Sequence, residues 1–376
     1  MTFQPLSLRL RRALPMRQSR PDRRTPSRGL ATCGLCAALL LSACGLVGSG
    51  QARPQDPKDR PYRIETVSFA GGPGVTLAGE LTMPPSGGPF KAVALISGSG
   101  PQDRNESVAD HRPFLVLSDY LTRAGYAVLR YDDRGTEEST GSYEDAALPD
   151  FADDAAGAFR YLQSRPEIDK TAIGFIGHSE GGEIAPFAAA QVDPAFMVFL
   201  AGSGRRTLPD VLATQVADIA RAQGVDEDEI AEAKEVIEQA SRILARPAPL
   251  PEIREELNSY LKSKGLGRSS RQAYLAQYGN RWGVSQATND PTVSLRALNV
   301  PVLALFGEKD LQVAARYEAP VMRSALRHPR SRVETIEGVN HLFQPAETGL
   351  PSEYGEIETT ILPSVLERIR TWMDAL

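Results

Sequence analysis

The amino-acid sequence predicts an α/β protein with a mostly parallel sheet that is covered by helices on both faces. Short apolar runs alternate with amphipathic helical segments over residues 91–204 and again over 300–376. The apolar runs are nearly continuous, which is typical of parallel strands buried on both faces. Residues 205–290 contain helical stretches but no convincing strand, so we expect an all-helical insertion within one sheet domain.

The first 43 residues have the features of a secretory signal. Residues 1–28 contain eight arginines and one acid, and a short apolar stretch follows that is too brief for a membrane span. The segment Leu41-Ser42-Ala43-Cys44 resembles the lipobox of bacterial lipoproteins. We therefore expect residues 1–43 to be removed and Cys44 to be lipidated, which anchors an exported protein to the cell envelope. In a Gram-negative host this would be the outer membrane or the periplasmic side. A plain cleaved signal, or initiation at Met16, is the alternative.

The rest of the chain is acidic and contains no cysteine beyond Cys44. Cys33 and Cys36 form a C-x-x-C pattern, but both lie inside the signal, where a redox or zinc site is not expected. Loss of eight arginines and one aspartate with residues 1–43 changes the net charge from −5 to −12. An acidic protein is a poor nucleic-acid binder, so no nucleic-acid partner is expected. Residues 44–61, rich in Gly, Pro and charge, predict a flexible tether.

The elements of the first core segment, 62–204, follow in order. Residues 62–84 alternate apolar and polar on both sides of Gly71-Gly72-Pro73-Gly74, which indicates a hairpin. Glycines stop a strand at 91–100, and an amphipathic helix at 111–125 ends at a glycine. The same logic gives a strand at 126–135, a helix at 149–166, a strand at 171–182, a helix at 183–191 and a strand at 195–204.

Helices at 208–224 and 226–245 are expected in the insertion, the second with a capping box formed by Asp226 and Glu229. The acidic run 226–229 lacks EF-hand spacing, so it is interpreted as a helix start and not as a calcium site. The second core segment, 291–376, resumes with a strand at 300–310, a helix at 314–327, a strand at 332–341 and a helix at 361–376. We expect the insertion to act as a cap over the carboxyl ends of the strands.

Residues 173–182 read IGFIGHSEGG and place Ser179 in a G-x-S-x-G pattern. The pattern alone is weak, but here it stands between an apolar strand and a helix. A tight strand-to-helix turn projects its serine hydroxyl from the carboxyl end of the sheet, and only small neighbours fit beside it. The following helix N-terminus also favours developing negative charge. Ser179 is therefore the predicted nucleophile.

A serine nucleophile needs a base, and the base needs an acid that fixes its tautomer. Of the four histidines, His178 adjoins the serine and should point away, His111 precedes the nucleophile, and His328 lies in a polar link. His341, in a loop after the last strand, is the predicted base. Asp310, in the loop after the preceding strand, is the predicted acid, with Glu308 as the alternative. The chain order Ser179, Asp310, His341 is that of α/β-hydrolases.

Two backbone N–H groups are expected to stabilise the oxyanion: that of Glu180, directly after the nucleophile, and that of Ser99, with Gly98 as the alternative. Charged residues near other strand ends, at 132–134 and 103–104, are interpreted as structural ion pairs that fix turns. The sequence contains no metal or cofactor motif, and neither a metal nor a cofactor is expected.

The segments ISGSGPQDRNE, DYLTRAGYAVLRYDDRGT, DFADDAAGAFRYL, IGFIGHSEGG, FGEKDLQV and NHLFQ together resemble a group of bacterial serine carboxylesterases of the α/β-hydrolase superfamily. The resemblance runs from about Tyr62 to the C-terminus and is weakest over 205–290. It implies hydrolysis of short acyl esters, with Ser179, Asp310 and His341 at the motif positions. Glu137 stands where related sequences usually have glycine. A peptidase, an acyltransferase or thioesterase with the same triad, and a non-catalytic binding lipoprotein are the alternatives.

Overall fold

A computed structural model describes residues 53–376 and contains one eight-stranded sheet with the order β1-β2-β4-β3-β5-β6-β7-β8. The β1–β2 and β2–β4 pairs are antiparallel, and all other neighbours are parallel. The predicted α/β class is therefore confirmed. The strands are β1 (Arg63–Ala70), β2 (Thr76–Met83), β3 (Phe90–Ile96), β4 (Ala127–Tyr131), β5 (Ile168–His178), β6 (Met197–Leu200), β7 (Val302–Gly307) and β8 (Arg332–Ile336).

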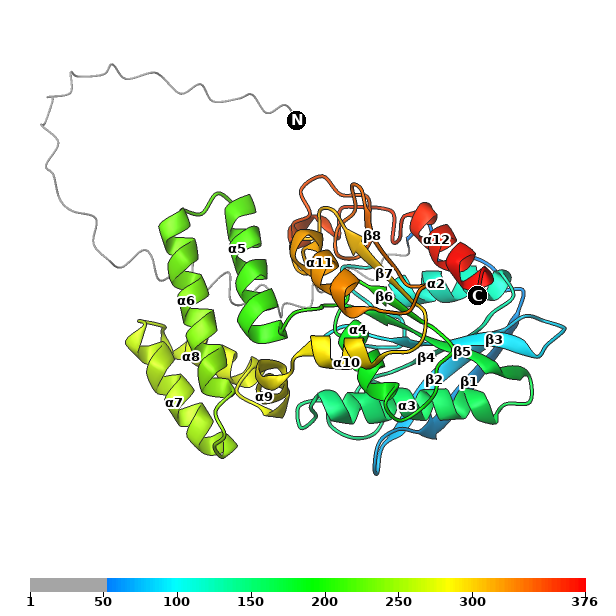
Figure 1. Cartoon of the computed structure of the whole chain (residues 1–376), viewed down its shortest axis with the longest axis horizontal. Coiled ribbons are helices and arrows are strands. Elements are labelled where there is room, and N and C mark those ends of the chain that lie inside the picture. The colour runs from blue at the N-terminus through cyan, green and yellow to red at the C-terminus, as the bar shows by residue number, and fades with distance from the viewer. Residues whose placement is uncertain (1–52) are drawn as a thin grey trace, which may run out of the picture.

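Helices cover both faces of this sheet. On one face, α2 (Pro113–Arg123) packs against β2 and β4 and contacts α12 (Pro363–Asp374). A second, continuous row is formed by α3 (Leu148–Ser164), α4 (Gly181–Ala188), α10 (Pro291–Ala297) and α11 (Ala315–Ala325). Figure 1 shows α2 and α12 above the sheet and α3 below it. This two-sided cover explains why the central strands are apolar along their whole length.

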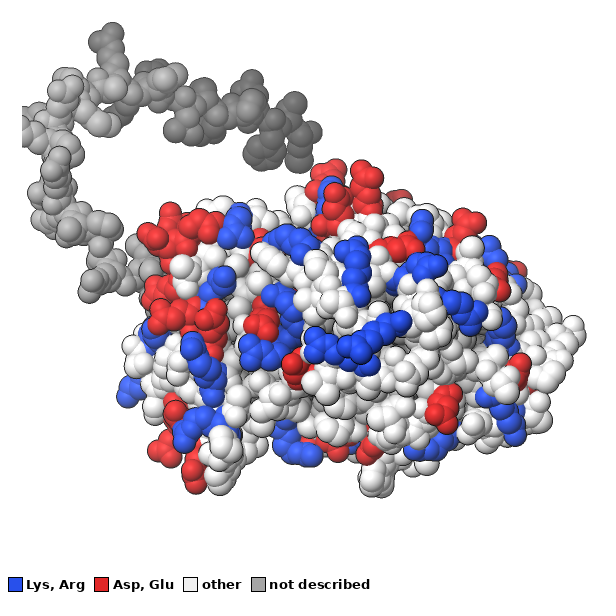
Figure 2. Space-filling view, in the orientation of Figure 1, with Lys and Arg blue, Asp and Glu red and all other residues white. Residues whose placement is uncertain are grey.

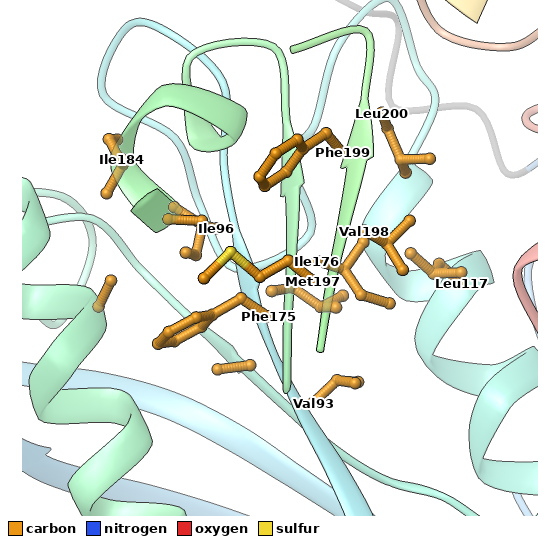
Figure 3. Close-up of a cluster of buried hydrophobic side chains, with 14 of the residues drawn as sticks. Val93, Ile96, Leu117, Phe175, Ile176, Ile184, Met197, Val198, Phe199 and Leu200 are labelled. Atoms are coloured by element: carbon orange, nitrogen blue, oxygen red, sulfur yellow. The ribbon is translucent and has the colours of Figure 1, made fainter. Parts of the chain in front are cut away.

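The two strands beside the candidate nucleophile are part of the hydrophobic core. Phe175 and Ile176 of β5 and Phe199 of β6 are fully buried. Figure 3 shows Ile184 of α4 on one side of these strands and Leu117 of α2 on the other. Burying a large apolar side chain contributes about 1.5–3 kcal/mol, so this packing holds the end of β5 in a fixed place.

Between β6 and β7 the chain forms the cap. It comprises a π-helical turn (Thr207–Leu212) and the helices α5 (Ala213–Ala222), α6 (Glu227–Leu244), α7 (Leu250–Ser263), α8 (Arg268–Gln277) and α9 (Arg281–Thr288). The cap packs around its own hydrophobic cluster, which includes Val236, Leu257 and Tyr274. It lies beside the core on the left of Figure 1. In Figure 2, acidic side chains gather over this part, and Lys and Arg alternate with acids elsewhere on the same face.

The start of α6 has the predicted N-cap, Asp226, but this side chain accepts from Asp228 and not from Glu229, the predicted capping-box partner. Asp226 is the N-cap residue, and its side chain accepts a hydrogen bond from the N–H of Asp228 at 2.9 Å. The acidic residues that follow lie in the first turn of the helix, where they interact favourably with its dipole. This arrangement explains the acidic run as a helix start.

The segment expected to be a tether is partly docked. The Arg53 guanidinium donates hydrogen bonds to the carbonyls of Ala109 and Gly355, and the Gln55 amide pairs with Thr360 and Ile361. Residues 53–61 therefore differ from the expected flexible linker, because side-chain contacts with distant loops fix their start. The expected signal peptide and Cys44 lie outside the described residues. No helix in the described range 53–376 is both long and apolar enough to cross a membrane.

Candidate active site

Ser179 occupies a strained turn between β5 and α4. Its φ of +51° is in the left-handed region, which a non-glycine residue rarely adopts. A Cβ on Gly177 would collide with the backbone of Gly181, and a Cβ on Gly181 would collide with the carbonyl of Ile96. The Ser179 N–H donates to the carbonyl of Leu200 at 2.8 Å, which ties the turn to β6. The two glycines thus give the serine its room, as the sequence indicates.

His341 and Asp310 form a buried pair beside this turn. The Nδ1 of His341 lies 2.8 Å from the Asp310 Oδ2. The other carboxylate oxygen of Asp310 accepts the N–H groups of Gln312 and Val313, at 2.7 and 2.9 Å. Burial opposes ionisation, but the His341 ring and these N–H donors lower the pKa of Asp310 below its ordinary value. The ionised carboxylate holds the proton of His341 on Nδ1 and leaves Nε2 as the free base.

The remaining candidates take other places. The His111 ring is buried between the Thr360 hydroxyl and the Tyr354 carbonyl, and His328 lies in the link between α11 and β8. The His178 ring contacts the Glu106 carboxylate and the carbonyl of His341. Glu308, the alternative acid, accepts the N–H of Gly338 in the turn after β8.

Two of the three proposed oxyanion donors keep a free N–H. In the described part of the chain, neither the Ser99 N–H nor the Glu180 N–H is used in a hydrogen bond, and both residues line the pocket that contains Ser179 and His341. The Gly98 N–H donates to the Glu106 carboxylate at 2.6 Å. Since that N–H is already used, Gly98 is not an available oxyanion donor, and the alternative is corrected.

Carboxylates fix the loop that carries Ser99. The Asp133 carboxylate accepts the Ser97 hydroxyl at 2.7 Å and the N–H of Gln102 at 2.9 Å. The Asp132 carboxylate binds the Arg104 guanidinium, and the Tyr143 hydroxyl accepts the N–H of Gly100. Asp132 and Arg104 therefore form a structural ion pair, as the sequence suggests, whereas Asp133 fixes the loop through neutral donors and not through an ion pair.

Glu137 lies on the surface in a left-handed conformation, with a φ of +47°. This is the geometry that favours glycine, the residue that related sequences usually have here. The exposed carboxylate does not line the pocket.

The cap contacts two carboxyl groups at and just after the nucleophile turn, those of Glu180 and Glu183. The indole N–H of Trp282 and the side-chain amide of Gln286, both on α9, donate to the Glu180 Oε1. Burial raises the pKa of Glu180 to about 7. Glu183, one turn further along α4, accepts the hydroxyls of Ser203 and Thr207, and burial raises its pKa to about 8. All of these side chains line the same pocket.

Sequence reasoning found the residues at strand ends and missed those that reach the site from elsewhere. Glu106 lies in the middle of the long loop between β3 and α2, and Trp282 and Gln286 lie in the weakly patterned insertion. The sequence predicts a role for Glu180 through its backbone N–H only. The one sequence feature that could have indicated a role for its side chain is the pair Glu180 and Glu183, because two acids are unusual beside a site where negative charge develops.

A serine on a strained elbow, a histidine that lines the same pocket and is bonded to a buried aspartate, and this sheet order together define an α/β-hydrolase fold of the serine-hydrolase class. The chain belongs to the X-Pro dipeptidyl-peptidase (S15) family, whose match covers residues 73–323. The matched range includes Ser179 and Asp310 and ends before His341.

Individual relatives are distant. Esterase EstD of Thermotoga maritima is 23% identical over 318 residues, which cover 79% of this chain and 65% of EstD. The chain thus spans less than two thirds of that relative. The esterase Pf2001 of Pyrococcus furiosus has 14% identity and a TM-score of 0.52, with 85% of this chain and 93% of that one covered. The α/β hydrolase GrgF of Penicillium sp. sh18 has 16% identity and a TM-score of 0.51, with 83% and 98% covered. At these identities the solved structures show the fold.

Proposed function

We propose that the protein is a carboxylesterase-type serine hydrolase that cleaves carboxylic esters through an acyl-enzyme. One observation carries the proposal: His341, which is bonded to the buried Asp310 carboxylate, lines the same pocket as Ser179 on its elbow. The similarity to EstD supports an ester as the substrate.

The proposed reaction runs through an acyl-enzyme. His341 Nε2 takes the proton of Ser179 Oγ as the oxygen attacks the ester carbonyl, and Asp310 stabilises the resulting imidazolium. The N–H groups of Ser99 and Glu180 receive the oxyanion. His341 then gives its proton to the leaving alcohol. A water, activated by the same histidine, attacks the acyl-enzyme, and Ser179 is regenerated with release of the acid.

The pocket favours short acyl groups. Its empty volume, including the open mouth, is about 650 Å³. Apolar side chains such as Leu208 and Val211 line one part, but Glu180 and Glu183 lie close to the nucleophile. These polar side chains leave a long alkyl chain little apolar surface to bury next to the nucleophile, so extra methylenes would add little binding free energy there. Short esters do not depend on that contribution.

A peptidase is the second candidate, because the family match names X-Pro dipeptidyl-peptidases. An acyltransferase or thioesterase would use the same triad with a different acceptor or leaving group. A non-catalytic binding lipoprotein would leave the polarised His341 without a purpose.

The deciding experiment compares residues 45–376 with the Ser179→Ala variant on p-nitrophenyl esters from acetate to decanoate and on an X-Pro p-nitroanilide. We expect hydrolysis of acetate and butyrate that is lost in the variant. Turnover of the anilide without the esters would establish the peptidase. Failure of the wild type to react with a fluorophosphonate would favour the binding lipoprotein.

We also propose that Cys44 is lipidated and anchors the exported enzyme to the cell envelope, on the outer membrane or the periplasmic side in a Gram-negative host. The lipobox-like segment ending at Cys44 supports this. Eight residues separate Cys44 from Arg53, and they span at most about 29 Å, so the catalytic body would lie near the membrane. Fractionation after Cys44→Ser tests the anchor: release into the soluble fraction is expected, and unchanged membrane association contradicts it.

A further inference from the structure

Behind the candidate triad lies a second histidine–carboxylate pair, formed by His178 and Glu106. The His178 Nδ1 is 2.8 Å from the Glu106 Oε1, and its Nε2 is 3.1 Å from the backbone carbonyl of His341. Both side chains are buried, with 7% and 3% exposure. The rings of His178 and His341 lie against each other with centroids 4.9 Å apart. The pair belongs to neither the triad nor the oxyanion donors.

The contacts define the charge of the pair. The carboxylate on one side and the carbonyl on the other both accept hydrogen bonds, so both ring nitrogens of His178 donate only when the ring is an imidazolium. Burial lowers the pKa of His178, but the Glu106 carboxylate and the His341 carbonyl, with a smaller contribution from Asp310, raise it above the ordinary value. The charge is balanced by Glu106, whose other oxygen is buried and has no hydrogen-bond partner in the described structure.

The same pair joins two loops of the site. The Glu106 Oε1 that contacts His178 also accepts the N–H of Gly98, next to the proposed donor Ser99. The Nε2 of His178 contacts the backbone carbonyl of His341, the proposed base. Glu106 adopts a left-handed backbone conformation, with a φ of +52°, which costs free energy unless its contacts require it. His178 also directly precedes Ser179, so three loops converge on one ring.

We propose that the His178–Glu106 ion pair is a positioning unit that sets the oxyanion loop and the His341 loop in register with Ser179. This inference rests on the proposed serine-hydrolase function. The pair touches no reacting atom and acts through Ser99 and His341. Because a displacement of about 1 Å can cost about 100-fold in rate, the pair is expected to affect turnover more than substrate binding.

The test uses Glu106→Gln and His178→Gln, with His111→Gln as the matched control. A glutamine at 106 can still accept from Gly98, but a neutral imidazole has one proton, so one of the two His178 hydrogen bonds is lost. His111 is also buried and bonded at both ring nitrogens, but its ring contacts Thr360 and Tyr354 and neither Gly98 nor the backbone of His341. We expect kcat for p-nitrophenyl acetate to fall about 10–100-fold in both pair variants, with KM within about threefold. His111→Gln should lower Tm while kcat stays within about twofold.

Two further measurements separate the possible outcomes. The rate at which a fluorophosphonate labels Ser179 should fall in parallel with kcat. A wild type that neither labels nor turns over ester would overturn the proposed function, and the positioning role with it. A labelled wild type whose pair variants label equally fast would overturn the positioning role alone, as would a kcat loss no larger than in His111→Gln.

Histidine ¹⁵N NMR gives a readout independent of activity: with only four histidines, the signal lost in His178→Gln should be doubly protonated at pH 7. A singly protonated ring would overturn the ion pair.

Discussion

Glu183 should make the fold less stable as pH rises, whereas an acid in a salt bridge makes a fold more stable as pH rises. It lies on the first turn of α4, where its side chain is buried and bonded to two hydroxyls, and its Oε2 has no partner in the described structure. Burial raises the pKa of Glu183 from 4.5 to about 8, although the Ser203 and Thr207 hydroxyls partly stabilise its charged form. The Glu183→Gln substitution keeps the shape and an acceptor oxygen and removes the charge.

The sign follows from proton linkage. Between the unfolded and folded pKa values, the folded state binds more protons than the unfolded state, so the free energy of unfolding falls as pH rises. The stabilisation from neutral Glu183 is complete below about pH 4.5 and is lost as pH rises through about 8. With about 1.36 kcal/mol per pKa unit, the wild type should lose roughly 2–3 kcal/mol from this group between pH 6 and pH 9.

Urea unfolding of residues 45–376 at pH 6, 7, 8 and 9 measures the effect as a difference between variants. The free energy of unfolding of Glu183→Gln, relative to that of the wild type, should rise by roughly 2–3 kcal/mol between pH 6 and pH 9. Glu255→Gln, at an exposed position on α7, should run parallel to the wild type. Parallel curves for all three proteins would refute the argument, because they would mean that Glu183 ionises equally in the folded and unfolded states.

Two further substitutions test the turn and the triad. Glu137→Gly should raise the free energy of unfolding by about 0.5–1 kcal/mol in urea, because glycine relieves the left-handed strain at the cost of some unfolded-state entropy; a decrease would contradict this. Asp310→Asn should lower kcat on p-nitrophenyl acetate by about 10³–10⁴-fold, whereas Glu308→Gln should stay within about twofold. The reverse ranking would move the acid to Glu308.

The nucleophile elbow could be predicted because its requirements are local. Gly177 and Gly181 flank Ser179 at fixed spacing, and any larger side chain would strike the backbone. The His341 and Asp310 positions followed from chain order, since a parallel sheet brings the ends of β7 and β8 to the same edge as the end of β5. Strand rhythm and order were enough for this part of the fold and site.

Contacts made by side chains from irregular segments could not be predicted in the same way. Arg53 docks a segment whose Gly- and Pro-rich composition is typical of a linker, because backbone carbonyls far away in sequence satisfy its guanidinium. Glu106 belongs to a loop with no periodicity, and Trp282 belongs to a cap whose placement over the sheet no local pattern specifies. In each case the partner is defined by tertiary geometry alone.

The three residues of the elbow show why sequence spacing finds a nucleophile more easily than its support. His178, at the end of β5, contacts Glu106 and the His341 loop. Ser179 faces the pocket, and Glu180 binds Trp282 of the cap. A strained turn sends consecutive side chains in divergent directions, so one tripeptide joins the oxyanion loop, the base and the cap. A substitution in any of those three regions can therefore change turnover without contacting the substrate. The change should be larger for residues that contact the turn directly than for residues that do not.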